Sequence, residues 1–231
     1  MRAWRVVLVV LGLLAATVSC SSDDGPTRVL LVGDSVMHQL GDALIDQAPR
    51  GVKVRNEAVW GSGLLSPWFV DWPANLNDLL DQYDPDIVVF LFVGNYNFGG
   101  DHEYETASGV RIPDRTSPAF FRAWQAQAEH MTERAAEAGA EVAWILPPPM
   151  SGPDGQAVVD GLRDVYEQVA EDTGAELIDA NDVLARENGS FLARGTNADG
   201  ESVPLRSPDG VHLAPTGAAR LAALVRDHLG L

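Results

Sequence analysis

Cysteine and basic residues are scarce in this chain of 231 residues. Cys20 is the only cysteine, so no disulfide can form within the chain, and metal sites built on paired cysteines are excluded. Lysine and arginine together number 16 against 33 aspartate and glutamate residues, which gives a formal net charge of −17. Because a surface this acidic repels phosphate backbones, we expect no nucleic-acid partner.

Motifs of several common enzyme classes are also missing. The chain has no Gly-x-Ser-x-Gly motif, which argues against the nucleophile elbow of the α/β-hydrolases, and it has no Walker-type phosphate loop. His102 and Glu103 are not followed by a second histidine at Thr106, so the zinc-binding helix of metalloproteases is excluded. We therefore expect neither a metal nor an organic cofactor.

The first 19 residues have the plan of a secretory signal peptide. Two arginines precede an uncharged, mostly apolar run of 13 residues, Val6–Val18, which is too short to span a bilayer comfortably. The run ends in Thr17-Val18-Ser19-Cys20, which resembles the lipobox of bacterial lipoproteins, although Thr17 stands where leucine is usual. The resemblance implies cleavage before Cys20, lipid attachment to Cys20, and a polar tether over residues 20–27 that anchors the protein at the outer face of the cytoplasmic membrane. An ordinary signal peptide with an incidental cysteine is the alternative.

From residue 28 onward, short β-branched runs alternate with longer segments of helical periodicity. This alternation predicts a three-layer α/β/α sandwich with a central, parallel, five-stranded sheet, formed by one domain over residues 28–231. The segment 86–93 is apolar almost throughout, which predicts a strand in the middle of the sheet. The predicted strands are 28–33, 51–59, 86–93, 141–146 and 176–179, and the predicted helices are 36–47, 73–83, 117–138, 155–172 and 215–229. The connections 95–116 and 188–208 are long enough to indicate functional loops.

Two short motifs could together form a nucleophilic centre. Ser35 follows Gly33 and Asp34 where the first predicted strand meets the first helix, so we expect it at the carboxyl edge of the sheet. Asp209 and His212 precede the last helix, and their spacing allows the carboxylate to orient one imidazole nitrogen while the other stays free to deprotonate a serine. Helix capping at Asp34 and an ordinary Asp-Gly turn are simpler explanations of either motif alone.

In these motifs and their order the chain resembles the SGNH hydrolases, also called GDSL-type esterases, over nearly the whole of residues 28–231. The first family block matches Gly33-Asp34-Ser35, and the last matches the segment DGVHLAPTG that begins at Asp209. The resemblance implies a flavodoxin-like α/β fold with Ser35 as nucleophile and with Asp209 and His212 completing the triad. It also implies that Gly61, five residues after Asn56, donates its backbone amide to an oxyanion hole together with the amide of Ser35.

The third family block departs from its usual Gly-x-Asn-Asp pattern. The chain has Val93-Gly94-Asn95-Tyr96-Asn97 at this place. Counting from Pro85 aligns Asn95 with the oxyanion asparagine, and a slipped alignment places Tyr96 there instead. We predict Asn95 as the donor, because a side-chain amide can donate without carrying a charge. Asn97 is the alternative if the loop is displaced.

The resemblance implies a serine esterase that hydrolyses short-chain or O-acetyl esters outside the cytoplasm, with acetylated glycans of the cell envelope as candidate substrates. Two alternatives remain open, namely an O-acyltransferase acting on envelope glycans and a non-catalytic surface binding protein on the same scaffold. The aromatic residues Trp60, Trp68, Trp72 and Tyr96 cluster near the second and third blocks. They either stack on a sugar ring or pack in the core or a lid.

Overall fold

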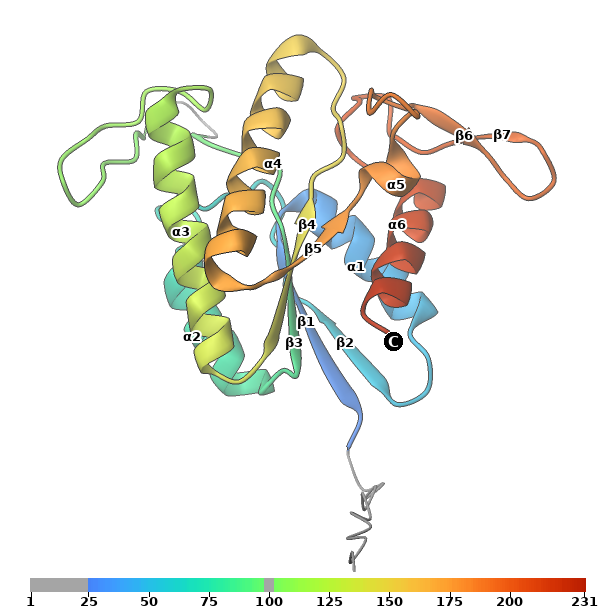
Figure 1. Ribbon diagram of the computed structural model, residues 1–231, viewed down its shortest axis with the longest axis horizontal. Coiled ribbons are helices and arrows are strands. Elements are labelled where there is room, and N and C mark those ends of the chain that lie inside the picture. The colour runs from blue at the N-terminus through green and yellow to red at the C-terminus, as the bar shows by residue number, and fades with distance from the viewer. Residues whose placement is uncertain (1–24, 98–101) are drawn as a thin grey trace, which may run out of the picture.

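The computed structural model describes residues 25–97 and 102–231, which form a parallel sheet between two layers of helices (Figure 1). The five strands are β1 (Thr27–Gly33), β2 (Val52–Asn56), β3 (Ile87–Leu91), β4 (Glu141–Leu146) and β5 (Glu176–Asp179). Their order in the sheet is β2-β1-β3-β4-β5, and all neighbouring pairs are parallel. The predicted α/β/α sandwich is confirmed, and β3 lies in the middle of the sheet with every residue buried, as its apolar sequence predicts.

The helices divide between the two faces of the sheet (Figure 1). One face packs on α2 (Trp72–Tyr83), α3 (Pro118–Glu137) and α4 (Pro153–Thr173), and the other packs on α1 (Ser35–Gln47), α5 (Asn181–Leu184) and α6 (Pro215–His228). Successive residues of β1 alternate between the two cores: Leu30 and Val32 belong to the first, and Val29 and Leu31 to the second. No helix in the described segments combines the length and hydropathy needed to cross a bilayer.

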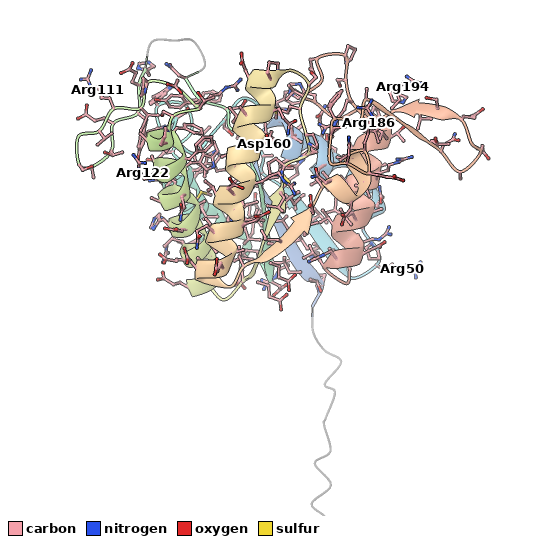
Figure 2. All side chains as sticks on the ribbon, turned by 45° about the horizontal axis from the view of Figure 1, so that its top comes forward. Arg50, Arg111, Arg122, Asp160, Arg186 and Arg194 are labelled. Atoms are coloured by element: carbon pink, nitrogen blue, oxygen red, sulfur yellow. The ribbon has the colours of Figure 1, made fainter. Side chains whose placement is uncertain are left out.

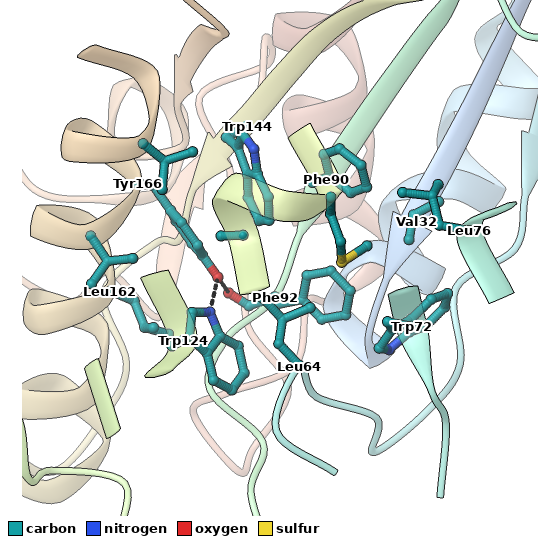
Figure 3. Packing of buried hydrophobic residues seen from close by; sticks show 14 of the residues in the cluster. Val32, Leu64, Trp72, Leu76, Phe90, Phe92, Trp124, Trp144, Leu162 and Tyr166 are labelled. Atoms are coloured by element: carbon teal, nitrogen blue, oxygen red, sulfur yellow. Dashed lines mark hydrogen bonds between the residues drawn. The ribbon is translucent and has the colours of Figure 1, made fainter. Parts of the chain in front are cut away.

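A group of aromatic residues in the first core supports the end of β3 (Figure 3). Tyr166 on α4 is fully buried, and its hydroxyl accepts a hydrogen bond from Trp124 Nε1 at 3.0 Å and donates one to the carbonyl oxygen of Phe92 at 3.0 Å. Phe92 directly follows β3, so this pair of hydrogen bonds fixes the point where the chain leaves the sheet. Burial raises the pKa of Tyr166 well above its ordinary value, and the hydroxyl therefore keeps the proton that it donates.

Two strands end earlier than predicted. The second strand ends at Asn56 instead of residue 59, although the amides of Glu57 and Val59 still donate to backbone carbonyls of β1. The third ends at Leu91, because beyond it the amide of Val93 donates to the side chain of Asp34 at 2.7 Å instead of to a neighbouring strand. In both cases the chain turns into a loop at the carboxyl edge of the sheet.

The long connection 188–208 contains structure that the sequence pattern does not predict. The short strands β6 (Arg194–Thr196) and β7 (Ser202–Pro204) pair there as an antiparallel hairpin. The single turn of α5, which precedes this connection, is also absent from the predicted elements. Figure 2 shows Arg194 on this hairpin and Arg111 on the loop before α3, which project to opposite sides of the molecule. Elements of three or four residues are too short to show periodicity in the sequence.

Candidate active site

Ser35 lies at the tight junction between β1 and α1. A Cβ atom at Gly33 would come within 2.2 Å of the carbonyl oxygen of Leu91, so only glycine allows this strand to approach β3 so closely. Asp34 caps α1, because its carboxylate accepts a hydrogen bond from the amide of Val36 at 3.0 Å. The junction therefore presents Ser35 at the first turn of the helix, above the carboxyl edge of the sheet.

Ser35, His212 and Asp209 form a continuous hydrogen-bonded chain. His212 Nε2 lies 2.9 Å from Ser35 Oγ, and His212 Nδ1 lies 2.7 Å from Asp209 Oδ2. The other oxygen of Asp209 accepts the backbone amides of Val211 at 2.8 Å and His212 at 3.0 Å. Although burial acts in the opposite direction, these hydrogen bonds from the imidazole and the two amides lower the pKa of Asp209 to about 2. Asp209 is therefore ionised at neutral pH, and the three predicted residues have the geometry of a catalytic triad.

Gln39, which sequence reasoning missed, holds the histidine loop against the helix of the serine. Its side-chain oxygen accepts the amide of Leu213 at 2.8 Å, and its side-chain nitrogen donates to the carbonyl of the same residue at 3.1 Å. Gln39 lies one turn after Ser35 on α1, so this double hydrogen bond ties Leu213, and with it His212, to the helix that carries the nucleophile. Its partners are backbone atoms 174 residues away, and no local motif marks such a pair.

The two loops implied for the oxyanion hole meet beside Ser35. Within the described segments, the backbone amides of Ser35 and Gly61 have no hydrogen-bond acceptor. Gly61 has a φ of +75°, a conformation that favours glycine. A Cβ atom at Gly63 would lie 1.9 Å from the carbonyl oxygen of Asn95, so a second glycine lets the loop after β2 press against the loop after β3.

Asn95 is already engaged by two acceptors in this structure. Its side-chain nitrogen donates to Asp34 Oδ2 at 3.2 Å and to the carbonyl oxygen of Ser62 at 3.1 Å. Asn97, the alternative donor, instead uses its side-chain oxygen to accept the amide of His102 at 3.2 Å. Both asparagines line the cavity above Ser35, but only Asn95 is tied to the residue that caps the nucleophile helix.

Tyr96 stands where the alignment of the third block places an aspartate. Its hydroxyl donates to the carbonyl of Ile112 at 2.6 Å and accepts the amide of Tyr104 at 2.8 Å. Its ring lies against Phe120 at the start of α3, with the ring centroids 5.6 Å apart. Tyr96 therefore anchors the long connection before α3 beside the site.

Asp34 is fully buried, and the donors to its carboxyl group among the described residues are all N–H groups. One oxygen accepts the amide of Val36, and the other accepts the amide of Val93 and the side chain of Asn95. Burial raises the pKa of Asp34 to about 7, while the hydrogen bonds from the amides of Val93 and Val36 and the nearby His212 act in the opposite direction. This carboxyl group links the serine turn directly to the loop of Asn95.

A cavity of about 1130 Å³ opens above the triad, and its wall is rich in aromatic side chains. Ser35, Gly61, Asn95, Asp209 and His212 all line it, so the structure brings together every predicted site residue of the domain; Cys20 lies outside the described residues. Trp60 stacks on the His212 ring with centroids 5.2 Å apart, and Trp68 lies 5.2 Å from the ring of His102. Trp60, Trp68 and Phe69 are 50%, 37% and 56% exposed, whereas Trp72 is buried in the core.

Solved structures with the same fold are those of esterases and lipolytic proteins of low sequence identity. A protein described as lipolytic and of the G-D-S-L family, from Desulfitobacterium hafniense DCB-2, is 14% identical with a TM-score of 0.62, over 87% of this chain and 98% of its own. The esterase EstA from a Pseudoalteromonas species is 16% identical with a TM-score of 0.55, over 88% and 97% of the two chains. The acetyl xylan esterase AlAXEase is 14% identical with a TM-score of 0.57, over 87% and 99%.

These neighbours confirm that the fold is that of the SGNH, or GDSL-type, hydrolases. Within proteins of this fold, the chain belongs to the family described as "Protein of unknown function (DUF459)", whose sequence profile matches residues 28–228. A search of curated proteins gave no significant match.

Proposed function

We propose that the protein is a serine esterase that uses Ser35 as nucleophile, His212 as general base and Asp209 to orient and stabilise the imidazole. The observation that carries the proposal is the chain of hydrogen bonds from Ser35 through His212 to Asp209, at 2.9 and 2.7 Å, inside a cavity that can admit a substrate. A non-catalytic binding protein would have no need of this geometry. The same geometry would serve an acyltransferase, and an assay with an added sugar acceptor distinguishes the two activities.

The proposed reaction has two steps. Ser35 Oγ attacks the ester carbonyl while its proton passes to His212 Nε2, and collapse of the tetrahedral intermediate expels the alcohol with that proton. Water then attacks the acyl-enzyme, giving a proton to His212, which returns it to Ser35 as the carboxylic acid leaves. The amides of Ser35 and Gly61, and the side chain of Asn95, stabilise the negative oxygen of both intermediates.

We further propose that the substrate is a short acyl ester, such as an O-acetyl group, on a carbohydrate. The half-exposed indole of Trp60 and the partly exposed indole of Trp68 offer flat apolar faces next to polar cavity residues such as Asn97 and Ser151. Sugars bind to such surfaces because one face of the ring is apolar while the hydroxyl groups need hydrogen bonds.

An extracytoplasmic location fits this class of substrate. The proposed anchor at Cys20 precedes β1, and β1 enters the sheet at the edge opposite to Ser35 (Figure 1). Seven residues of strand separate these edges, a distance of about 20 Å. If the edge of the sheet at the amino ends of the strands faces the bilayer, the cavity faces away from the membrane and toward polymers of the envelope.

Replacing Ser35 by alanine tests the chemistry. We expect the Ser35→Ala domain to melt at the parent temperature and to lose several orders of magnitude in turnover of p-nitrophenyl acetate. Ser108→Ala, which removes an exposed hydroxyl on a distant turn, is the matched control and should keep the parent rate. Parent-like hydrolysis by Ser35→Ala would overturn the proposed mechanism.

Replacing Trp68 by alanine tests the substrate class. We expect Trp68→Ala to lose at least tenfold in kcat/KM on acetylated xylo-oligosaccharides and to change less than threefold on p-nitrophenyl acetate, which has no sugar to bind. Faster turnover of p-nitrophenyl octanoate than of p-nitrophenyl acetate and of the acetylated xylo-oligosaccharides would contradict the carbohydrate proposal. Transfer of acetate to an added oligosaccharide in preference to water would identify an acyltransferase.

A further inference from the structure

A buried arginine lies behind the loop that carries Asp209 and His212. Arg206 is 4% exposed, and among the described residues it forms no ion pair. Burial lowers the pKa of Arg206 to about 10, although the negative charge of Asp209 opposes this change, so the guanidinium remains charged at neutral pH. Burying a cation is costly unless its N–H groups are bound. Nε of Arg206 has no partner among the described residues, so the hydrogen bonds of the two Nη groups indicate what this side chain does.

The guanidinium of Arg206 donates to two loop carbonyls instead of to a carboxylate. Nη1 donates to the carbonyl oxygen of Val211 at 2.9 Å, and Nη2 donates to that of Pro149 at 2.7 Å. Its backbone amide donates to the carbonyl of Ala193 at 3.2 Å, and its charge lies 5.7 Å from the ring centroid of Phe191. One residue thus joins the loop after β4, the segment before β6 and the loop of the triad.

The contact with Val211 acts on the triad through a single peptide group. The carbonyl that accepts from Arg206 belongs to the peptide between Val211 and His212, and the N–H of this same peptide donates to Asp209 Oδ1 at 3.0 Å. A cation bound to the carbonyl oxygen polarises the peptide and makes its N–H a stronger donor. That donor holds Oδ1 of Asp209, which leaves Oδ2 directed at the imidazole 2.7 Å away.

We propose that Arg206 is a positioning residue, which fixes the Asp209-His212 pair by clamping the Val211-His212 peptide against the loop after β4. This inference rests on the proposed function. Ser151 holds the same two loops together through its amide, which donates to the carbonyl of Gly210 at 3.1 Å. A lysine could not replace Arg206 fully, because a single ammonium group does not reproduce the planar fork that reaches two carbonyls in different directions.

Two substitutions at Arg206 and one matched control test the proposal. Arg206→Met removes the charge and both hydrogen bonds, and Arg206→Lys keeps the charge with a different geometry. Arg163→Met is the control: Arg163 also donates to a carbonyl of the loop after β4, that of Pro147 at 3.3 Å, but it pairs with Asp179 and, within the described part of the chain, forms no hydrogen bond with the triad loop. All variants are assayed on p-nitrophenyl acetate well below their melting temperatures.

We expect Arg206→Met to lower kcat about 10- to 100-fold with KM changed less than twofold, because a misplaced base affects the transition state more than substrate binding. Arg206→Lys should recover part of the loss, and Arg163→Met should lower the melting temperature while keeping kcat within threefold. Parent kcat in folded Arg206→Met, or equal kcat losses in Arg206→Met and Arg163→Met, would overturn the proposal.

If Arg206→Met does not fold, Arg206→Lys decides: a kcat at least threefold below the parent supports the proposal, and the parent value refutes it. The result is separable from the proposed function. Full activity of Ser35→Ala would refute both, whereas an inactive Ser35→Ala with an unaffected Arg206 variant would refute only the role of Arg206.

Discussion

Asn95 has two tasks in the proposed mechanism, and truncating it to alanine separates them. In the free protein its side-chain nitrogen donates both hydrogens, one to Asp34 Oδ2 at 3.2 Å and one to the carbonyl of Ser62 at 3.1 Å. To stabilise the oxyanion it has to redirect one of these hydrogens when the substrate carbonyl arrives. Asn95→Ala should therefore lower both the stability of the fold and the rate of the reaction.

The two effects of Asn95→Ala can be given magnitudes. A hydrogen bond to a neutral carbonyl contributes about 1 kcal/mol and one to a carboxylate about 2 kcal/mol, so the free energy of unfolding should fall by about 3 kcal/mol. An oxyanion donor lowers the transition-state free energy by about 3 kcal/mol, from which about 1 kcal/mol is subtracted for the hydrogen bond that is broken to supply it. The net of about 2 kcal/mol corresponds to a kcat about 30-fold lower.

Urea denaturation and steady-state kinetics on p-nitrophenyl acetate measure both quantities in the same protein. KM should stay within twofold of the parent, because the donor acts mainly in the transition state. Asn97→Ala is the matched control, since Asn97 lines the same cavity and, among the described residues, its side chain bonds to the amide of His102 alone. Its kcat should stay within threefold of the parent. A parent kcat in folded Asn95→Ala, or a larger kcat loss in Asn97→Ala, would refute the assignment of Asn95.

Three further predictions concern the general base, pH and the membrane. His212→Ala should lower kcat on p-nitrophenyl acetate by several orders of magnitude, because the proton of Ser35 then has no acceptor; parent activity in the folded variant would contradict this base. Burial raises the pKa of Asp34 to about 7 from 3.8, so between these values the folded protein holds a proton that the unfolded chain has lost. Stability should therefore fall by about 2 to 3 kcal/mol from pH 5 to 8, and urea denaturation of Asp34→Asn should lack this component. In the native host, Cys20→Ser should move the protein from the detergent phase to the aqueous phase, and equal partitioning of both forms would remove the lipid anchor.

The sequence predicts those parts of the molecule that depend on local pattern. The apolar run of β3 indicates a central strand because both faces of such a strand are buried. The spacing of Asp209 and His212 indicates their pairing because three residues in a turn suffice to bring a carboxylate to an imidazole. Gln39 and Arg206 escaped prediction because their partners are backbone atoms of distant loops, and any residue can supply a backbone carbonyl.

Buried or half-buried polar side chains secure the loops that carry Asn95 and His212. Tyr166 holds the carbonyl of Phe92 at the end of β3, Asp34 holds the amide of Val93 beyond it, and Gln39 and Arg206 hold the two sides of His212. Such groups destabilise the fold when they lack partners, so each is stable only while its loop stays in place. The same hydrogen bonds that satisfy the buried groups thus keep the loops of Ser35, Asn95 and His212 in register. Precise placement of the site is therefore a consequence of satisfying the buried polar groups beneath it.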